Sequence, residues 1–131
     1  MDETVEAPPA QELRVVCDRR EETTAFVREM MGRLGEKWPI RVLDCLADGP
    51  IRFTALMAAL PGVSHRMLTV TLRALENDGM ISRTPYPEVP PRVEYELTPL
   101  GDSFVTHLLQ LVGWIQDHRV EIEISRKAVP R

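Results

Sequence analysis

The sequence predicts a mainly α-helical fold with one small β-hairpin, and three observations support this fold class. A helix predicted over 64–78 begins at the capping residue Ser64 and ends before Gly79. A shorter helix predicted over 54–60 precedes it across a tight turn. After Gly79 the pattern becomes extended, with a proline-rich tip at 87–91 between two strand-like segments. Two helices joined by a short turn and followed by a hairpin are typical of a winged helix-turn-helix.

Length and charge allow this fold and leave its partner open. The chain has 131 residues, 44% of them hydrophobic, which is enough for one domain with its own core. The net charge of −4 does not by itself favour nucleic acid. Acids in the first dozen residues account for the excess, because the remaining acids equal the bases in number. DNA affinity depends on where cations face phosphates, so the composition permits DNA binding.

The first residues, the apolar runs and the cysteines set expectations about the cellular compartment. The first residues carry neither the basic nor the apolar segment of a signal peptide, and no apolar run approaches the roughly 18 residues of a membrane span. Two cysteines far apart do not form a disulfide framework. We therefore expect a cytoplasmic protein without a membrane partner, with a flexible acidic tail at 1–12 and a single domain over 13–131.

The N-terminal half is predicted to be helical up to one short strand. An apolar stripe indicates a helix over 22–34, and a second helix begins at 37–39, with Pro39 suited to its first helical position. Its buried side is expected to consist of Trp38, Val42, Leu43 and Leu46. Residues 51–53 are long enough only for an edge strand. The DNA-binding core is expected over 36–98.

The last predicted helix, over 99–122, has an apolar surface too wide for a solvated face. Packing against a second copy, together with the first helix over 20–34, explains this width. Folding back over its own core is the alternative. The expected interface residues lie on these two helices: Phe26, Met30, Phe104, Leu108, Leu111 and Ile115.

The helix over 64–78 is the predicted DNA-reading helix, because its outer face is basic and carries no acid before the last turn. Its candidate DNA contacts are Ser64, His65, Arg66, Thr69, Val70 and Arg73. Arginines suit guanine edges or phosphates, the hydroxyls and His65 suit phosphate, and Val70 suits a thymine methyl. Arg92 in the hairpin is a further candidate, with Arg52 and Arg83 weaker ones. An ordinary solvated face is the alternative.

Several motifs in order resemble the HxlR-type transcriptional regulators over about 17–114. They are Gly35-Glu36-Lys37-Trp38, Gly49-Pro50-Ile51-Arg52-Phe53, Leu68-Thr69 with Leu72, Leu75-Glu76-Asn77-Asp78-Gly79, and Pro90-Pro91-Arg92-Val93-Glu94-Tyr95 with Leu97-Thr98 and Gly101. The resemblance implies a cytoplasmic, dimeric regulator, related in architecture to MarR-type proteins, that binds a pseudo-palindromic operator. Repression is the sign of regulation we expect, with activation as the alternative.

The resemblance also implies a sensing thiol just before the first helix, where Cys17 stands. Asp18 follows it, whereas the family usually has proline there. An unreactive thiol is the alternative, and an oxidant or a small-molecule effector is the expected kind of signal. Cys45, in the predicted helix that begins at 37–39, is expected to be a small core residue.

No catalytic residue set, metal-ligand spacing or cofactor motif emerges from the sequence, so we expect neither an enzyme nor a metal site. The competing function is a winged-helix module that binds another protein through its last helix and does not bind DNA. The salt dependence of binding separates the two functions, because contacts to phosphates release counterions.

Overall fold

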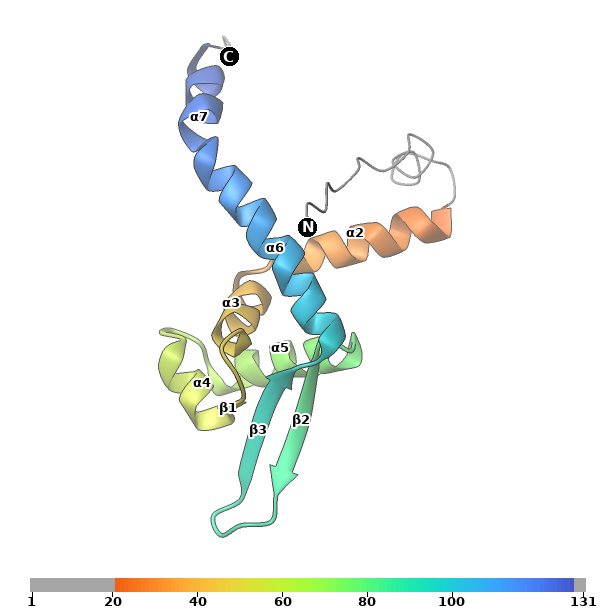
Figure 1. Cartoon of the computed structure of the whole chain (residues 1–131), viewed down its shortest axis with the longest axis vertical. Helices are drawn as coiled ribbons and strands as arrows, with labels where there is room; N and C mark the ends of the chain where they lie inside the picture. The colour runs from red at the N-terminus through yellow and green to blue at the C-terminus, as the bar shows by residue number, and fades with distance from the viewer. Residues whose placement is uncertain (1–20, 129–131) are drawn as a thin grey trace, which may run out of the picture.

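The computed structural model describes residues 21–128, so the predicted tail at 1–12 and Cys17 lie outside the described residues. Two of its helices and a hairpin give the arrangement predicted for a winged helix-turn-helix (Figure 1). In chain order the elements are α2 (Glu21–Gly35), α3 (Lys37–Leu46), β1 (Ile51–Arg52), α4 (Phe53–Ala59), α5 (His65–Asn77), β2 (Ile81–Tyr86), β3 (Arg92–Leu97), α6 (Pro99–Asp117) and α7 (Arg119–Ala128).

The small sheet has the strand order β1-β3-β2, with both pairings antiparallel. Its register places Ile51 opposite Tyr95, Ile81 opposite Leu97, and Tyr86 opposite Arg92. The two residues of β1 form an edge strand, as predicted. Because β1 runs directly into α4, this pairing attaches the first helix of the helix-turn-helix to the wing.

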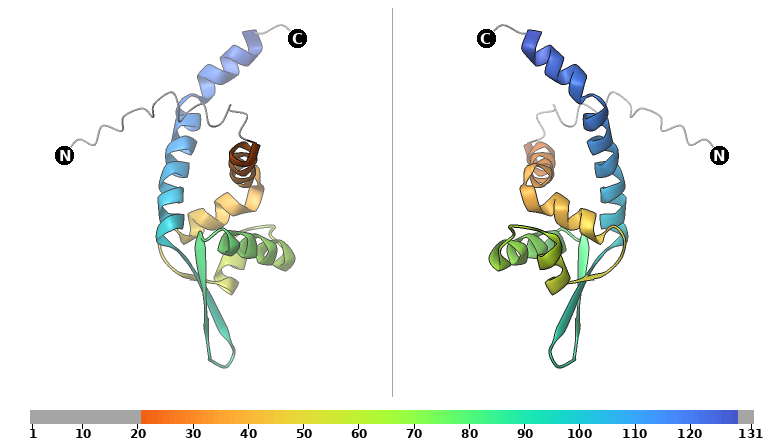
Figure 2. Two further views of the ribbon diagram at one scale, coloured as in Figure 1. Left: turned by 90° about the vertical axis from the view of Figure 1, so that its right-hand side faces the viewer. Right: turned by 90° about the vertical axis from the view of Figure 1, so that its left-hand side faces the viewer.

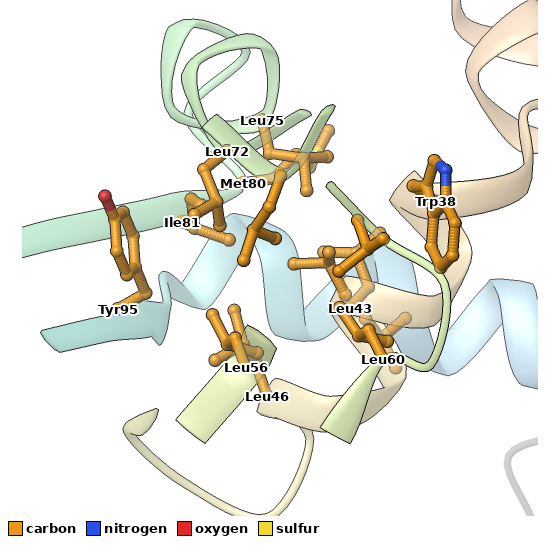
Figure 3. Close-up of a cluster of buried hydrophobic side chains, with 14 of the residues drawn as sticks. Trp38, Leu43, Leu46, Leu56, Leu60, Leu72, Leu75, Met80, Ile81 and Tyr95 are labelled. Atoms are coloured by element: carbon orange, nitrogen blue, oxygen red, sulfur yellow. The ribbon is translucent and has the colours of Figure 1, made fainter. Parts of the chain in front are cut away.

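The core lies where α3, α5, α6 and the base of the wing meet (Figure 3). On α3 the predicted buried side is confirmed, with Val42 at 0% exposure. The buried apolar side chains outside α3 are Leu56, Leu60, Val63, Leu68, Leu72, Leu75, Met80, Ile81, Tyr95, Val105 and Leu108. The inner face of α5 is therefore fixed against the rest of the domain, and only its outer face remains free.

Local signals set the boundaries of α5. The Ser64 hydroxyl accepts a hydrogen bond of 3.0 Å from the Met67 backbone N–H, which confirms the predicted N-cap. Beyond the helix, Gly79 adopts φ +76°, a conformation that favours glycine. In α3, however, Pro39 is the third helical residue rather than the first. The proline is tolerated there because the first-turn N–H groups have no partner within the helix.

The predicted continuous helix over 99–122 was wrong, because a turn at His118 divides it into α6 and α7. The His118 backbone leaves the helical region, at φ −106° and ψ 6°. Its ring Nδ1 and its backbone N–H both lie near the carbonyl oxygen of Trp114, at 2.8 and 3.1 Å. His107 makes the same ring contact to the Ser103 carbonyl at 2.8 Å, and α6 continues past it, so the backbone angles of His118 mark the division rather than its ring contact.

Residue Thr98 joins three elements at the base of the wing. Its hydroxyl donates to the Gly79 carbonyl at 2.5 Å and accepts from the Gly101 N–H at 3.0 Å. Its backbone N–H donates to the Met80 carbonyl at 3.1 Å. The end of β3, the start of α6 and the segment after α5 are therefore held together by one residue.

The wing and α7 extend from opposite ends of the domain, as Figures 1 and 2 show. Helix α2 also projects away from the core, and α7 has no buried residue. Within residues 21–128, no helix is long and apolar enough to cross a bilayer. The outward helices therefore leave apolar side chains on the surface, while the hairpin reaches out on the other side.

Candidate nucleic-acid interface

The outer face of α5 carries the predicted DNA-contacting residues in one exposed group. Arg66 and Arg73 are exposed, and Val70 is 53% exposed between them. The first turn of α5 contains no acidic residue, so the positive end of the helix dipole is not neutralised. This surface combines two cations with a helix end that favours anions, which suits a polyanion in contact with it.

The hydroxyl groups on this face have different hydrogen-bonding capacities. Ser64 accepts from the Met67 N–H, so its own hydrogen remains free to donate. Thr69 already donates to the His65 carbonyl at 2.8 Å, so in this conformation it can only accept. The prediction that both hydroxyls can donate to phosphate therefore fits Ser64 and does not fit Thr69 as it lies in the structure.

A cleft of about 490 Å³ separates the N-terminal end of α5 from the wing. Its lining includes His65 together with the arginines Arg52, Arg83 and Arg92, and Glu88 is its acidic residue. The His65 ring packs against Phe53 of α4, with ring centroids 4.9 Å apart and planes tilted by 57°. The cleft is therefore rich in positive charge and lies beside the reading face of α5.

Arg52 and Arg83 are the weaker candidates for DNA contact in the sequence, where they lie 31 positions apart. The sheet register brings their backbones close, since Arg52 pairs with Glu94 and Arg83 with the next residue, Tyr95, on β3. Neighbouring strand residues point to opposite faces, so the two side chains start on opposite faces of the sheet, and both residues line the cleft at its edge. Alternation along each segment could have marked both as strand residues, but only the three-stranded pairing gathers them at one cleft.

Arg92 is held against the wing rather than extended into solvent. Its guanidinium carbon lies 4.1 Å from the Tyr86 ring centroid, and its Nη2 lies 3.2 Å from a Glu88 carboxylate oxygen. Its buried Nε has no hydrogen-bond partner. A hydrogen bond to Glu94 and the charge of that carboxylate raise the pKa of the Tyr86 phenol. The wing is thus stiffened by side-chain contacts, and Arg92 would have to leave Glu88 to use its full charge elsewhere.

Comparison with known proteins decides the family. The family model that matches this chain is HxlR-like helix-turn-helix, over residues 33–123. The chain belongs to the HxlR-like family. The predicted resemblance and the winged helix-turn-helix fold are both confirmed. Members of this family are transcriptional regulators with a DNA-binding helix-turn-helix, and they are not enzymes.

Relatives of this HxlR-family chain cover most of its length. It is 45% identical over 110 residues to a helix-turn-helix-type transcriptional regulator of Methanothermobacter thermautotrophicus, covering 84% of each chain. Its structure resembles the transcriptional regulator ytfH from Salmonella typhimurium, with 39% identity, a TM-score of 0.66, and coverage of 77% and 90% of the two chains. It also resembles the redox regulator HypR in its reduced form, with 36% identity, a TM-score of 0.66, and coverage of 74% and 96%.

The predicted interface residues of this HxlR-family chain differ in exposure. Phe26, Leu111 and Ile115 are 62%, 42% and 49% exposed. Met30 and Phe104 are half-buried and pack against the core. Leu108 is only 6% exposed, so its side chain belongs to the core of its own chain and has little surface to offer a partner.

Four exposed apolar side chains on the same helices were not predicted as interface residues. They are Met31 on α2, at 55% exposure, and Leu100, Leu109 and Trp114 on α6, at 57%, 51% and 54%. Helical spacing marks these positions as apolar but cannot tell which of two apolar faces the domain itself covers.

Cys45 is partly buried in α3 beside the core. Burial, and next the charge of Asp44, raise the pKa of its thiol. A raised thiol pKa lowers the fraction of reactive thiolate at neutral pH. This environment is that of a structural cysteine, as predicted, rather than of a reactive one. Within residues 21–128, no group of His, Cys, Asp and Glu side chains is arranged to hold a metal ion.

Proposed function

We propose that this HxlR-family chain is a homodimeric repressor that binds a pseudo-palindromic operator. In each half-site α5 would enter the major groove and the wing would lie on the flanking backbone or in the minor groove. The observation that carries the proposal is the free outer face of α5, where Arg66, Val70 and Arg73 are exposed while the opposite face is fixed in the core.

Because its inner face is fixed in the core, α5 does not have to be reoriented when it binds DNA. Leu68, Leu72 and Leu75 are at most 2% exposed, so the orientation of α5 is set before DNA is met. The major groove is about 12 Å wide and admits a helix of this diameter. The basic cleft beside α5 supports a phosphate contact by Arg52 and Arg83, next to the groove that the helix occupies.

The exposed apolar side chains of α2 and α6 support the dimer. Phe26, Leu111, Trp114 and Ile115 are each more than 40% exposed, which is unusual for so many large apolar residues on two neighbouring elements. A second copy packed on these helices would cover them. A twofold axis there would place two α5 helices on one face of the duplex, and half-sites about 34–36 Å apart would match one helical turn.

Similarity to the redox regulator HypR supports a response to oxidants. We propose Cys17 as the sensing thiol, because the raised pKa of Cys45 argues against that residue. The test compares Cys17→Ser with Cys45→Ser after treatment with peroxide or a quinone. Operator release that persists in Cys17→Ser would refute the assignment, whereas loss of the response in Cys17→Ser alone would support it.

Mobility-shift titration tests the DNA-binding proposal. We expect Arg66→Ala and Arg73→Ala each to weaken operator binding by about 1–3 kcal/mol. Arg119→Ala is the matched control, since Arg119 is an exposed arginine on α7, far from the reading face. Unchanged affinity in both α5 variants would exclude this helix as the reader, and binding that is insensitive to salt would favour a protein partner over DNA.

A further inference from the structure

The N-terminal half of α5 exposes two neighbouring apolar side chains. Met67 is 45% exposed and Val70 is 53% exposed, and residues three apart on a helix lie next to each other on its surface. Along the helix axis the pair lies between Arg66 and Arg73, which are also exposed. The outer face thus presents an apolar patch with a guanidinium group toward each end.

Folding gives no reason for apolar residues at these positions. The core side of α5 is formed by Leu68, Leu72 and Leu75, and neither Met67 nor Val70 belongs to the core or to the set of side chains packed against it. Valine is also a poorer helix former than alanine, because its branched side chain loses freedom against the preceding turn. The apolar patch is therefore better explained by a contact outside the chain.

The other polar side chains of this region each make one contact within the chain. The Ser64 hydroxyl caps the helix, the Thr69 hydroxyl donates to the His65 carbonyl, and the His65 ring packs on Phe53. What remains for base edges is two guanidinium groups, the free hydrogen of the Ser64 hydroxyl and one apolar patch, and only the patch suits an apolar feature. In the major groove, arginine matches the O6 and N7 acceptors of guanine, and the C5-methyl group of thymine is the apolar feature.

We propose that Met67 and Val70 read the C5-methyl groups of thymine, so that each operator half-site carries A·T pairs between the positions faced by Arg66 and Arg73. This inference rests on the proposed function, because it requires α5 to lie in the major groove. Seven residues of helix rise by about 10 Å, which equals about three base-pair steps. One or two A·T pairs therefore fit between the positions that the two arginines face.

The test uses the full chain and an operator that the protein itself selects. The wild-type protein first selects its sites from a random double-stranded library. Each thymine of the selected half-site is then replaced in turn by deoxyuridine, which removes the C5-methyl group and keeps every pairing atom. We expect one or two replacements between the arginine-facing positions to weaken wild-type binding about fourfold each, the effect of one buried methyl group.

The variants Met67→Ala and Val70→Ala identify the side chain that reads each methyl group. We expect each variant to bind the thymine duplex more weakly and to lose its sensitivity to deoxyuridine at one position. Arg66→Ala is the matched control, because it should weaken binding and keep the full deoxyuridine effect. Deoxyuridine in the flanking sequence provides the control for altered duplex properties.

The outcomes separate the inference from the proposed function. Specific selection followed by wild-type binding that is indifferent to deoxyuridine throughout the half-site would overturn the inference and leave the proposed function standing. A deoxyuridine effect that persists in both apolar variants would also overturn it, since another group would then read the methyl. Selection of no sequence at all would overturn the proposed function and the inference together.

Discussion

The guanidinium of Arg33 donates to both carboxylate oxygens of Asp78, at 2.6 Å from Nε and 3.4 Å from Nη2. The pair joins the last turn of α2 to the residue that ends α5. A carboxylate at the C-terminal end of a helix faces the negative end of the helix dipole, which is unfavourable without a counter-charge. Arg33 supplies that charge, and the two side chains are only 23% and 20% exposed.

We expect Arg33→Met to lower the free energy of unfolding by about 1–2 kcal/mol, because it leaves the Asp78 carboxylate partly buried without its partner. Denaturant unfolding at one fixed protein concentration measures the change. The control is Arg119→Met, which removes an ion pair whose members are 75% and 50% exposed and should change stability by less than about 0.5 kcal/mol. Equal effects of the two substitutions would contradict the role given to the Arg33–Asp78 pair.

Gly101 lies where α6 passes the backbone that follows α5. A Cβ atom at this position would be 1.9 Å from the Met80 carbonyl oxygen, and a backbone atom cannot move aside easily. We expect Gly101→Ala to destabilise the domain by about 3 kcal/mol or more, measured as a loss of thermal and denaturant stability. Gly32→Ala is the matched control, because nothing lies within 4 Å of its added methyl group, and in a helix interior it should stabilise by about 0.5–1 kcal/mol.

The proposed dimer predicts a change in assembly when a charge enters the exposed face of α6. Ile115→Asp should convert the dimer into a monomer, because a carboxylate would be buried against apolar side chains of the second copy. Sedimentation or light scattering gives the mass. Val89→Asp at the wing tip replaces a fully exposed valine and should remain dimeric. A dimer in both variants would place the interface elsewhere.

The phenol of Tyr86 should titrate above the ordinary range of tyrosine. The hydrogen bond to Glu94, and next its charge, favour the neutral phenol and raise its pKa. Because the folded-state pKa is the higher one, the stabilisation is complete below the ordinary tyrosine pKa of about 10 and is lost as pH rises through the raised value. Absorbance titration of the phenolate measures this. Glu94→Gln should return the transition toward the ordinary pH, and Tyr86→Phe should remove it.

The order of the elements followed from the sequence because short-range signals mark most boundaries. Ser64 and Gly79 delimit α5 through bonds and backbone angles that depend on nearby residues alone. Periodic leucines identified the inner face of α5 for the same reason. The division at His118 was missed because the sequence there contains neither glycine nor proline, the residues that most often mark the end of a helix.

The site was predictable only in part, because a helix face follows from spacing whereas a cleft follows from packing. Arg66, Val70 and Arg73 are exposed as expected. The joint lining of the cleft by Arg52 and Arg83, and the ion pair between Arg33 and Asp78, depend on contacts between residues far apart in sequence. The sequence predicts Arg92 as a DNA contact of the wing and does not reveal that Tyr86 and Glu88 hold its guanidinium group.

Through its bonds to Gly79, Met80 and Gly101, Thr98 ties the start of α6 to the segment that follows α5, so that α5 and α6 move together. If two subunits are joined along α6, a small rotation between those helices cannot be absorbed at this joint. The rotation would instead change the separation of the two α5 helices. A small structural change near the twofold axis would then be enough to shift the two α5 helices away from the spacing of one helical turn of DNA.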